Sequence, residues 1–270
     1  MMKYEKYWGM EFNPFKKGYE DKNIYKSIDF NQTLARLEHL KNTKGIGLFT
    51  GNSGLGKTFA LKYFANTLNK NMYKVVYIPL STVTVLEFYR SLAFGLGLIP
   101  AIKKVDLYKT IQERIISLVK SKKITPVIII DEAQYLKTEV FNDIKLLLNF
   151  DMDSVNHVIF ILNGQPILND ILCKSVHEAL KQRIVVNYNS DGLNSNEIKE
   201  YINNSLDVAG IHEPIFNDNT YEAIYSCSNK SIRKINSLID KCLLIAYNQN
   251  MREIDTNIVM TAQNELELYV

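Results

Sequence analysis

The sequence predicts an α/β fold, a five-stranded parallel sheet flanked by helices, followed by a small all-helical domain. The first observation is that short runs rich in Val and Ile alternate with segments of helical apolar spacing. The second is that the strand signal stops near residue 188 and only helical patterns follow. The third is size, because 270 residues that are 46% hydrophobic can bury a large core and an appended smaller one.

Five apolar runs are the expected strands, because continuous apolar runs are typical of strands buried on both faces of a parallel sheet. They cover residues 45–50, 74–80, 126–131, 157–162 and 183–188.

Helices are expected between and after these runs, where apolar residues recur every three or four positions. Among the strands, the expected helices cover residues 58–70, 85–98, 107–121 and 140–150. Beyond the strands, they cover 220–228, 231–250 and 254–269, preceded by a helix within 189–210 that ends at Gly210.

Composition leaves the partner open and favours a soluble protein of the cytosol. The formal net charge of +3 is too small to indicate nucleic acid by itself. No apolar run approaches the roughly 20 residues that cross a bilayer, and the first residues lack the apolar core of a secretory signal. Cys173, Cys227 and Cys242 have no C-x-x-C spacing, so we expect buried thiols rather than disulfides or a zinc site.

The stretch GNSGLGKTF, residues 51–59, follows the first expected strand and opens the first expected helix. It contains the pattern G-x-x-x-x-G-K-[ST], which average composition produces by chance in about one chain of this length in a hundred. Such a loop directs backbone N–H groups at phosphate oxygens, while Lys57 adds positive charge and the Thr58 hydroxyl ligates Mg²⁺. We therefore expect a nucleoside triphosphate and Mg²⁺ here. The residues expected to bind the nucleotide are Gly51, Asn52, Ser53, Gly54, Leu55, Gly56, Lys57, Thr58 and Phe59.

Two adjacent acids, Asp131 and Glu132, end the third expected strand. A phosphate-binding loop needs a carboxylate on a neighbouring strand to hold the metal, and a hydrolase also needs a base that polarises water. We assign Asp131 to the metal and Glu132 to the water. A strand that simply runs into a turn is the alternative for this stretch taken alone.

These motifs resemble those of AAA+ ATPases, in particular the ExeA-like group, the transposition ATPases TniB and IstB, and the Orc/Cdc6 initiators. The resemblance covers nearly the whole chain through YWGMEFNPF, GNSGLGKT, VIIIDEAQYL, VIFILNGQPIL, ALKQRIVVNY and SNKSIRKINSLIDKCLLIAY. It implies an N-terminal segment and first helix that pack on the nucleotide site (1–44), an AAA+ core (45–189) and a helical lid (190–270).

The resemblance also implies three polar roles. Asn163 would sense the γ-phosphate, Arg183 would reach the γ-phosphate of a neighbouring subunit, and Arg233 would contact nucleotide from the lid of the same chain. The alternatives are a turn asparagine before glycine and two solvated arginines. Before Arg233 the family has a Gly-rich segment with proline, as in GNPRKIN, whereas this chain has Asn229, Lys230, Ser231 and Ile232, so the start of that helix is left open.

Aromatic residues before the phosphate loop help to build the adenine pocket in this family, and Phe15 and Tyr25 are the candidates here. A hydrophobic staple onto the core is an equal alternative. An arginine supplied by a neighbour requires head-to-tail contacts, which generate rings or helical filaments.

Related transposition ATPases contact duplex DNA through basic residues after the second strand. The corresponding residues here are Arg90, Lys103, Lys104, Lys120, Lys122 and Lys123, and solvated surface lysines are the alternative. We therefore expect an ATP-dependent transposition helper that binds duplex DNA and a transposase and has no membrane association. The alternatives are a nucleotide-switched scaffold for a protein partner, as in secretion, and a replication-initiator-like loader. The second alternative is disfavoured because residues 254–270 indicate one helix rather than a winged helix.

Overall fold

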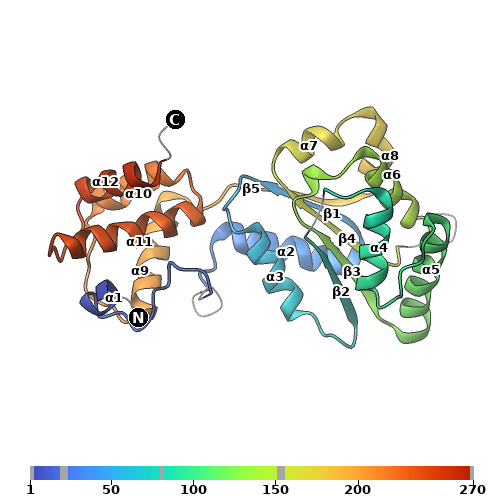
Figure 1. The fold of residues 1–270 in the computed structure, drawn as a ribbon, viewed down its shortest axis with the longest axis horizontal. Helices are drawn as coiled ribbons and strands as arrows, with labels where there is room; N and C mark the ends of the chain where they lie inside the picture. The colour runs from blue at the N-terminus through green and yellow to red at the C-terminus, as the bar shows by residue number, and fades with distance from the viewer. Residues whose placement is uncertain (1–2, 19–23, 80–81, 151–155, 268–270) are drawn as a thin grey trace. The chain divides into compact units, whose positions relative to one another are not determined.

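The computed structural model describes residues 3–18, 24–79, 82–150 and 156–267. The chain divides into two compact units, each described by itself. The sheet unit comprises residues 32–52 and 57–190, and the helical unit comprises residues 1–31, 53–56 and 191–270 (Figure 1).

The sheet unit contains five parallel strands in the order β2-β3-β4-β1-β5, which confirms the predicted fold class. The predicted strand at 74–80 ends at Ile78, and its last residue, Leu80, lies outside the described residues. The predicted strand at 157–162 begins and ends two residues later, so Asn163 belongs to it. The strands are β1 (Gly45–Gly51), β2 (Tyr73–Ile78), β3 (Thr125–Ile130), β4 (Ile159–Gly164) and β5 (Ile184–Ser190).

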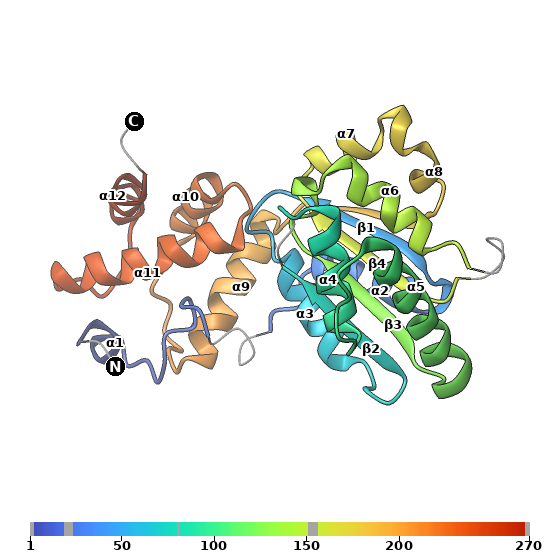
Figure 2. The ribbon, with the colours of Figure 1, turned by 45° about the vertical axis from the view of Figure 1, so that its right-hand side comes forward.

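Helices cover both faces of this sheet, and the strand residues alternate between the two covers. Val127 and Ile129 pack with α2 (Ile28–Thr43) and α3 (Lys57–Thr67). Ile128 and Ile130 point the other way, toward α4 (Val85–Gly95), α5 (Lys104–Ile116) and α6 (Thr138–Leu147), which Figure 2 shows in front of the strands. This period of two explains why residues 127–130 of β3 are all apolar.

The helical pattern at 107–121 continues beyond α5 as a π-helical turn, Ser117–Ser121. Three short elements between β4 and β5 were not predicted, because helices of one or two turns contain too few apolar repeats to show a period. They are α7 (Ile167–Leu172), a 3-10 turn (Ser175–His177) and α8 (Glu178–Lys181).

The helical unit has its own core, to which the N-terminal residues contribute. The helix α1 (Lys3–Tyr7) is followed by Trp8, whose indole N–H donates to the carbonyl oxygen of Leu243, at 3.0 Å. Asn194 and Glu197 form a capping box that starts α9 at Ser195. None of the helices in the described part of the chain is long and apolar enough to cross a membrane. The remaining helices are α9 (Ser195–Val208), α10 (Asp218–Ser228), α11 (Ile232–Asn248) and α12 (Thr256–Leu266).

Candidate nucleotide-binding site

The phosphate-loop motif lies between β1 and α3. Gly51 ends the strand, residues 52–56 form the loop, and Lys57, Thr58 and Phe59 begin the helix. The Lys57 ammonium donates to the carbonyl oxygens of Gly51 and Asn52, at 2.7 and 2.8 Å. The first backbone N–H groups of an α-helix lack intrahelical partners, and together with the helix dipole they attract anions. The loop therefore presents an ammonium and a helix N-terminus together.

Residues 53–56 of the loop group with the helical unit, where Arg233 contacts them. Its guanidinium donates to the Ser53 hydroxyl at 3.0 Å, and its backbone N–H donates to the carbonyl oxygen of Gly54 at 3.3 Å. Gly54 has a φ of +84°, and a Cβ there would overlap the Ser231 hydroxyl. Leu55 is buried. Arg233 thus lies against the loop of its own chain.

The start of α11 depends on two left-handed residues. Asn229 and Lys230 have φ values of 49° and 62°, in a region that L-residues other than glycine rarely adopt. The Ser231 hydroxyl then accepts from the Lys234 N–H and caps the helix. The helix begins at Ile232, which places Arg233 in the first turn without the glycine and proline of the family pattern.

Asp131 follows β3, is 6% exposed and accepts hydrogen bonds from the ends of β2 and β4, from α3 and from the next residue of the chain. One carboxylate oxygen accepts from the hydroxyls of Thr58, at 3.0 Å, and Tyr77, at 2.8 Å. The other accepts from the Asn163 side-chain amide, at 2.6 Å, and from the Glu132 backbone N–H, at 3.0 Å. The structure therefore brings together the predicted metal-side residues and the predicted sensor.

Tyr77 at the end of β2 was not predicted as a site residue. Burial, the hydrogen bond to Asp131 and the charge of that carboxylate raise the pKa of its hydroxyl, which stays a neutral donor. Tyr77 lies within the expected strand at 74–80, but only the pairing of β2 with β3 shows that its hydroxyl reaches Asp131.

The residues fit a magnesium ion held together with a nucleotide. Thr58 and Asp131 offer the oxygen ligands that Mg²⁺ prefers. The side-chain oxygen of Asn163, Oδ1, is buried and accepts no hydrogen bond from any described residue. The described residues contain no cluster of three His, Cys, Asp or Glu that could hold a metal by themselves. Mg²⁺ commonly takes one or two protein ligands and fills its shell with water and phosphate.

Glu132, the predicted water-polarising residue, is exposed and has a left-handed backbone, with φ 51° and ψ 40°. Its carboxylate accepts from the Gln134 side-chain amide at 2.6 Å. Gln134 in turn accepts from the backbone N–H of Gln165, at 3.0 Å. Neither glutamine was predicted, since an amide after two acids has no distinctive spacing.

Arg183 lies at the amino-terminal end of β5, whereas this site lies at the carboxyl ends of the strands. It precedes β5, which runs parallel to β1, and Ser190 at the far end of β5 pairs with Gly51. The length of β5 therefore separates Arg183 from the phosphate loop, about 20 Å at the usual rise per residue. That span exceeds the reach of an arginine side chain, so the structure does not bring Arg183 to the site of its own chain.

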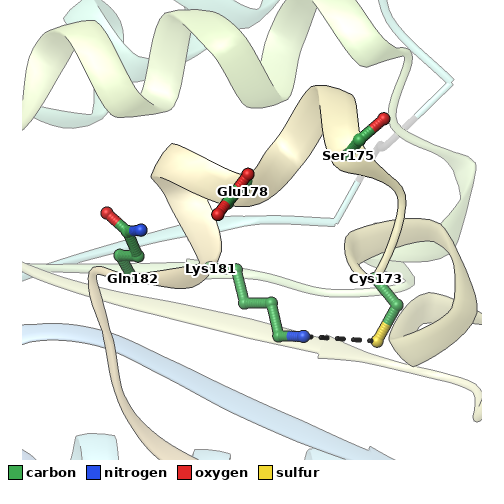
Figure 3. Close-up of a pocket in the computed structure, with 5 residues that line it drawn as sticks. All are labelled: Cys173, Ser175, Glu178, Lys181 and Gln182. Atoms are coloured by element: carbon green, nitrogen blue, oxygen red, sulfur yellow. Dashed lines mark hydrogen bonds between the residues drawn. The ribbon is translucent and has the colours of Figure 1, made fainter.

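Figure 3 shows a pocket lined by residues between 173 and 182, the segment that precedes Arg183 in the sequence. The Lys181 ammonium points at the Cys173 sulfur, 3.8 Å away. None of the predicted nucleotide-binding residues contributes to this pocket. Its lining residues are Cys173, Ser175, Glu178, Lys181 and Gln182.

The two predicted adenine residues pack within the helical unit. Phe15 is 5% exposed in its hydrophobic core. The Tyr25 hydroxyl donates to Glu200 at 2.7 Å, and its ring lies edge-on to Tyr201. Their role toward adenine stays a prediction.

The predicted basic residues do not form one cluster. Arg90 is exposed on α4. Residues 103–104 begin α5, whereas 122–123 follow its π-helical extension, about 25 Å away at the helical rise per residue. Lys104 is also committed to an ion pair, 2.8 Å from the buried carboxylate of Asp143. Lys103, Lys122 and Lys123 are exposed.

The chain is similar to proteins of known family and fold. Residues 40–172 match the family model described as an AAA domain. Over 93% of its length the chain is 27% identical to "General secretion pathway protein A" of Aeromonas hydrophila, covering 46% of that protein. Over 39% of its length it is 34% identical to "ATP-dependent target DNA activator B" of Escherichia phage Mu, covering 31% of that protein. The chain thus spans less than half the length of these relatives.

The fold is that of a solved structure of the ORC2 protein of Aeropyrum pernix, with a TM-score of 0.69 and 14% identity, over 97% of this chain and 74% of that one. Sheet order, phosphate loop and acidic strand end together define an AAA+ P-loop fold. The match of residues 40–172 to the AAA domain model agrees with the resemblance that the sequence motifs indicated.

Proposed function

We propose that this protein binds ATP with Mg²⁺ and hydrolyses it to ADP and phosphate. One observation carries the proposal: Asp131 accepts hydrogen bonds from Thr58 in the first turn after the phosphate loop and from Asn163 on β4. A buried carboxylate beside the phosphate loop is the arrangement that P-loop NTPases use to hold the metal. The ORC2 protein of Aeropyrum pernix was solved in complexes with ADPNP and ADP, which supports the choice of nucleotide.

The roles follow from the positions of the residues. Lys57 and the N–H groups of the loop hold the phosphates, while Thr58 and Asp131 hold Mg²⁺ directly or through water. Bound there, Mg²⁺ neutralises charge on the phosphate oxygens. Glu132 accepts a proton from the attacking water, and Asn163 donates toward the γ-phosphate.

Two substitutions separate binding from hydrolysis. Lys57→Ala should abolish ATP binding measured by calorimetry, because the ammonium and its position over the loop are lost. Glu132→Gln should bind ATP like the wild type and hydrolyse it at least about a hundredfold more slowly, since general-base contributions are typically that large. Undiminished affinity in the first variant, or normal turnover in the second, would contradict the assigned role.

We further propose that the chain forms head-to-tail oligomers in which Arg183 completes the site of a neighbour. The span of β5 between Arg183 and the phosphate loop supports action on another subunit. Arg183→Ala and Lys57→Ala chains, each inactive alone, should regain activity when mixed, because one partner supplies the arginine and the other a working site. No recovery at any mixing ratio would exclude this arrangement.

We propose duplex DNA as the ligand of the oligomer, with a transposase as protein partner, in the cytoplasm. The name of the phage Mu relative, an ATP-dependent target DNA activator, supports this choice. ATP hydrolysis should be measured against protein concentration, with and without duplex DNA, at two salt concentrations. Phosphate contacts predict stimulation by DNA that weakens as salt rises. A specific rate indifferent to both DNA and concentration would contradict the DNA proposal.

A second candidate is a nucleotide-switched scaffold for a protein partner, and one observation favours it. Large apolar side chains lie exposed around the turn between α4 and α5, where Phe94 is 77%, Ile99 97% and Ile102 82% exposed. Exposed apolar residues close together are typical of protein interaction sites. If this candidate is right, nucleotide state should change partner binding, and DNA should leave hydrolysis unchanged.

A further inference from the structure

The side-chain amide of Gln134 connects Glu132, which follows β3, with Gln165, which follows β4. It lies in the 3-10 turn Ala133–Tyr135 that follows β3 and is half-buried. Its Nε2 donates to the Glu132 carboxylate at 2.6 Å, and its Oε1 accepts from the backbone N–H of Gln165 at 3.0 Å. Both ends of the side chain are therefore engaged.

The orientation of Glu132 needs such a partner. Its backbone is left-handed, an arrangement that is unfavourable for an L-residue. Its side chain is exposed, so packing does not restrict its rotamer. The Gln134 amide holds the Glu132 carboxylate through a short, charge-assisted hydrogen bond of 2.6 Å.

The other end of Gln134 is fixed by the end of β4. Gly164 lies directly against the Gln134 amide, and a Cβ at residue 164 would come within 2.6 Å of its Oε1 and 2.9 Å of a Leu168 methyl group. A side chain at residue 164 would therefore displace the amide. The neighbouring Asn163 donates to Asp131, so the β4 end contacts Asp131 directly and Glu132 through Gln134.

We propose that Gln134 is a positioning residue that orients the Glu132 carboxylate for water activation and couples that orientation to the end of β4. The inference rests on the proposed ATP hydrolysis and adds a residue that acts through Glu132 rather than on the nucleotide. A shift of the Asn163–Gln165 segment moves the Gln165 N–H and with it the Oε1 of Gln134. The Nε2 of the same amide then moves too, and it carries the Glu132 carboxylate with it. Contact of the β4 end with phosphate is thereby transmitted to the base.

Two substitutions that preserve side-chain size test the donor and the acceptor of the amide. Gln134→Leu removes both donor and acceptor. Gln134→Glu keeps an acceptor for the Gln165 N–H but places a carboxylate against Glu132. We expect both variants to bind ATP with wild-type affinity and KM, and to lose about 10- to 100-fold in kcat, the cost of a misplaced reacting group.

Hydrogen exchange of the Gln165 amide provides a readout that does not depend on turnover. Without nucleotide, this exchange should accelerate in Gln134→Leu and stay at the wild-type rate in Gln134→Glu, because only the first variant lacks an acceptor. Equal exchange in all three proteins would overturn the contact, and melting temperatures report whether each variant folds.

A double-mutant cycle shows whether Gln134 acts through Glu132. In a Glu132→Gln background, Gln134→Leu should reduce kcat no further, because residues that act as a unit are not additive. A multiplied loss, or wild-type kcat in Gln134→Glu, would overturn the inference and leave the proposed ATPase intact. Wild-type turnover in Glu132→Gln alone would instead overturn the proposed role of Glu132, and this inference with it.

Discussion

Asn163 donates its side-chain amide to Asp131 at 2.6 Å, between the ends of the neighbouring strands β4 and β3. The carboxylate assigned to the metal and the amide assigned to the γ-phosphate are therefore joined by a direct hydrogen bond. The Asn163 oxygen remains buried and unpartnered among the described residues. A buried acceptor without a donor costs free energy, which is a known feature of sites shaped for a ligand.

Replacing Asn163 should affect hydrolysis more than binding. Asn163→Ala removes a donor that we place toward the γ-phosphate, so kcat should fall about 100-fold, the usual cost of losing one such donor. KM for ATP should change only a few-fold. Asn169→Ala is the matched control, because its amide donates to Thr50 at 2.9 Å instead of Asp131. Equal losses in both variants would mean that Asn163 is structural.

Tyr77→Phe should raise the Mg²⁺ requirement. The variant leaves Asp131 without one of the hydroxyl donors that orient its carboxylate, and residues that orient metal ligands commonly affect metal affinity about tenfold or more. The Mg²⁺ concentration for half-maximal hydrolysis should therefore rise about tenfold, while ATP affinity measured without Mg²⁺ stays constant. Tyr73→Phe, at the other end of β2, is the control and should match the wild type. An unchanged Mg²⁺ titration in Tyr77→Phe would refute the role.

Lys104 should prove structural, in contrast to its neighbour Lys103. Asp143 is 3% exposed, and both the Lys104 ammonium, at 2.8 Å, and the Tyr89 hydroxyl, at 3.1 Å, donate to it. Lys104→Ala leaves a buried carboxylate without its cation and should lower the free energy of unfolding by about 1–3 kcal/mol. Lys103→Ala, at an exposed position, should change stability by less than about 0.5 kcal/mol. Chemical denaturation of both variants decides this.

The same pair of variants separates stability from DNA binding. If Lys103 contacts phosphate, Lys103→Ala should weaken DNA binding with no loss of stability. The slope of log K against log salt concentration should become shallower by about one. A normal salt dependence in Lys103→Ala would assign this lysine to the solvated surface.

His177 should make the protein less stable at acidic pH. Its ring is 1% exposed, neither ring nitrogen has a hydrogen-bond partner among the described residues, and burial together with the nearby Lys174 lowers its pKa. Above about pH 6.5 the imidazole is neutral in both states and contributes no pH dependence. Below that value the unfolded chain binds a proton that the folded chain refuses, so stability falls by up to about 1.4 kcal/mol per pH unit.

His177→Leu should remove this contribution, so the stability difference from the wild type should shift in favour of the variant as pH falls from 7 to 5. Thermal or urea unfolding across that range measures it. Parallel pH profiles for the wild type and His177→Leu would contradict the prediction.

The sequence alone determined the fold class and the order of the motifs. Strands such as β1 and β3 are visible because residues buried on both faces of a parallel sheet form continuous apolar runs. The phosphate loop is visible because its glycines and Lys57 occur at fixed spacing along one stretch of chain. These signals are local, so one sequence suffices to predict them.

Only the tertiary structure decided which side chains meet. The order β2-β3-β4-β1-β5 brings Tyr77 and Asn163 to Asp131 from strands far apart in the sequence. The Gln165 N–H reaches Gln134 in the same way, whereas its other partner, Glu132, is a neighbour along the chain. Strand order and hydrogen-bond partners depend on contacts between distant parts of the chain, whereas periodicity and motif spacing record only neighbours along it.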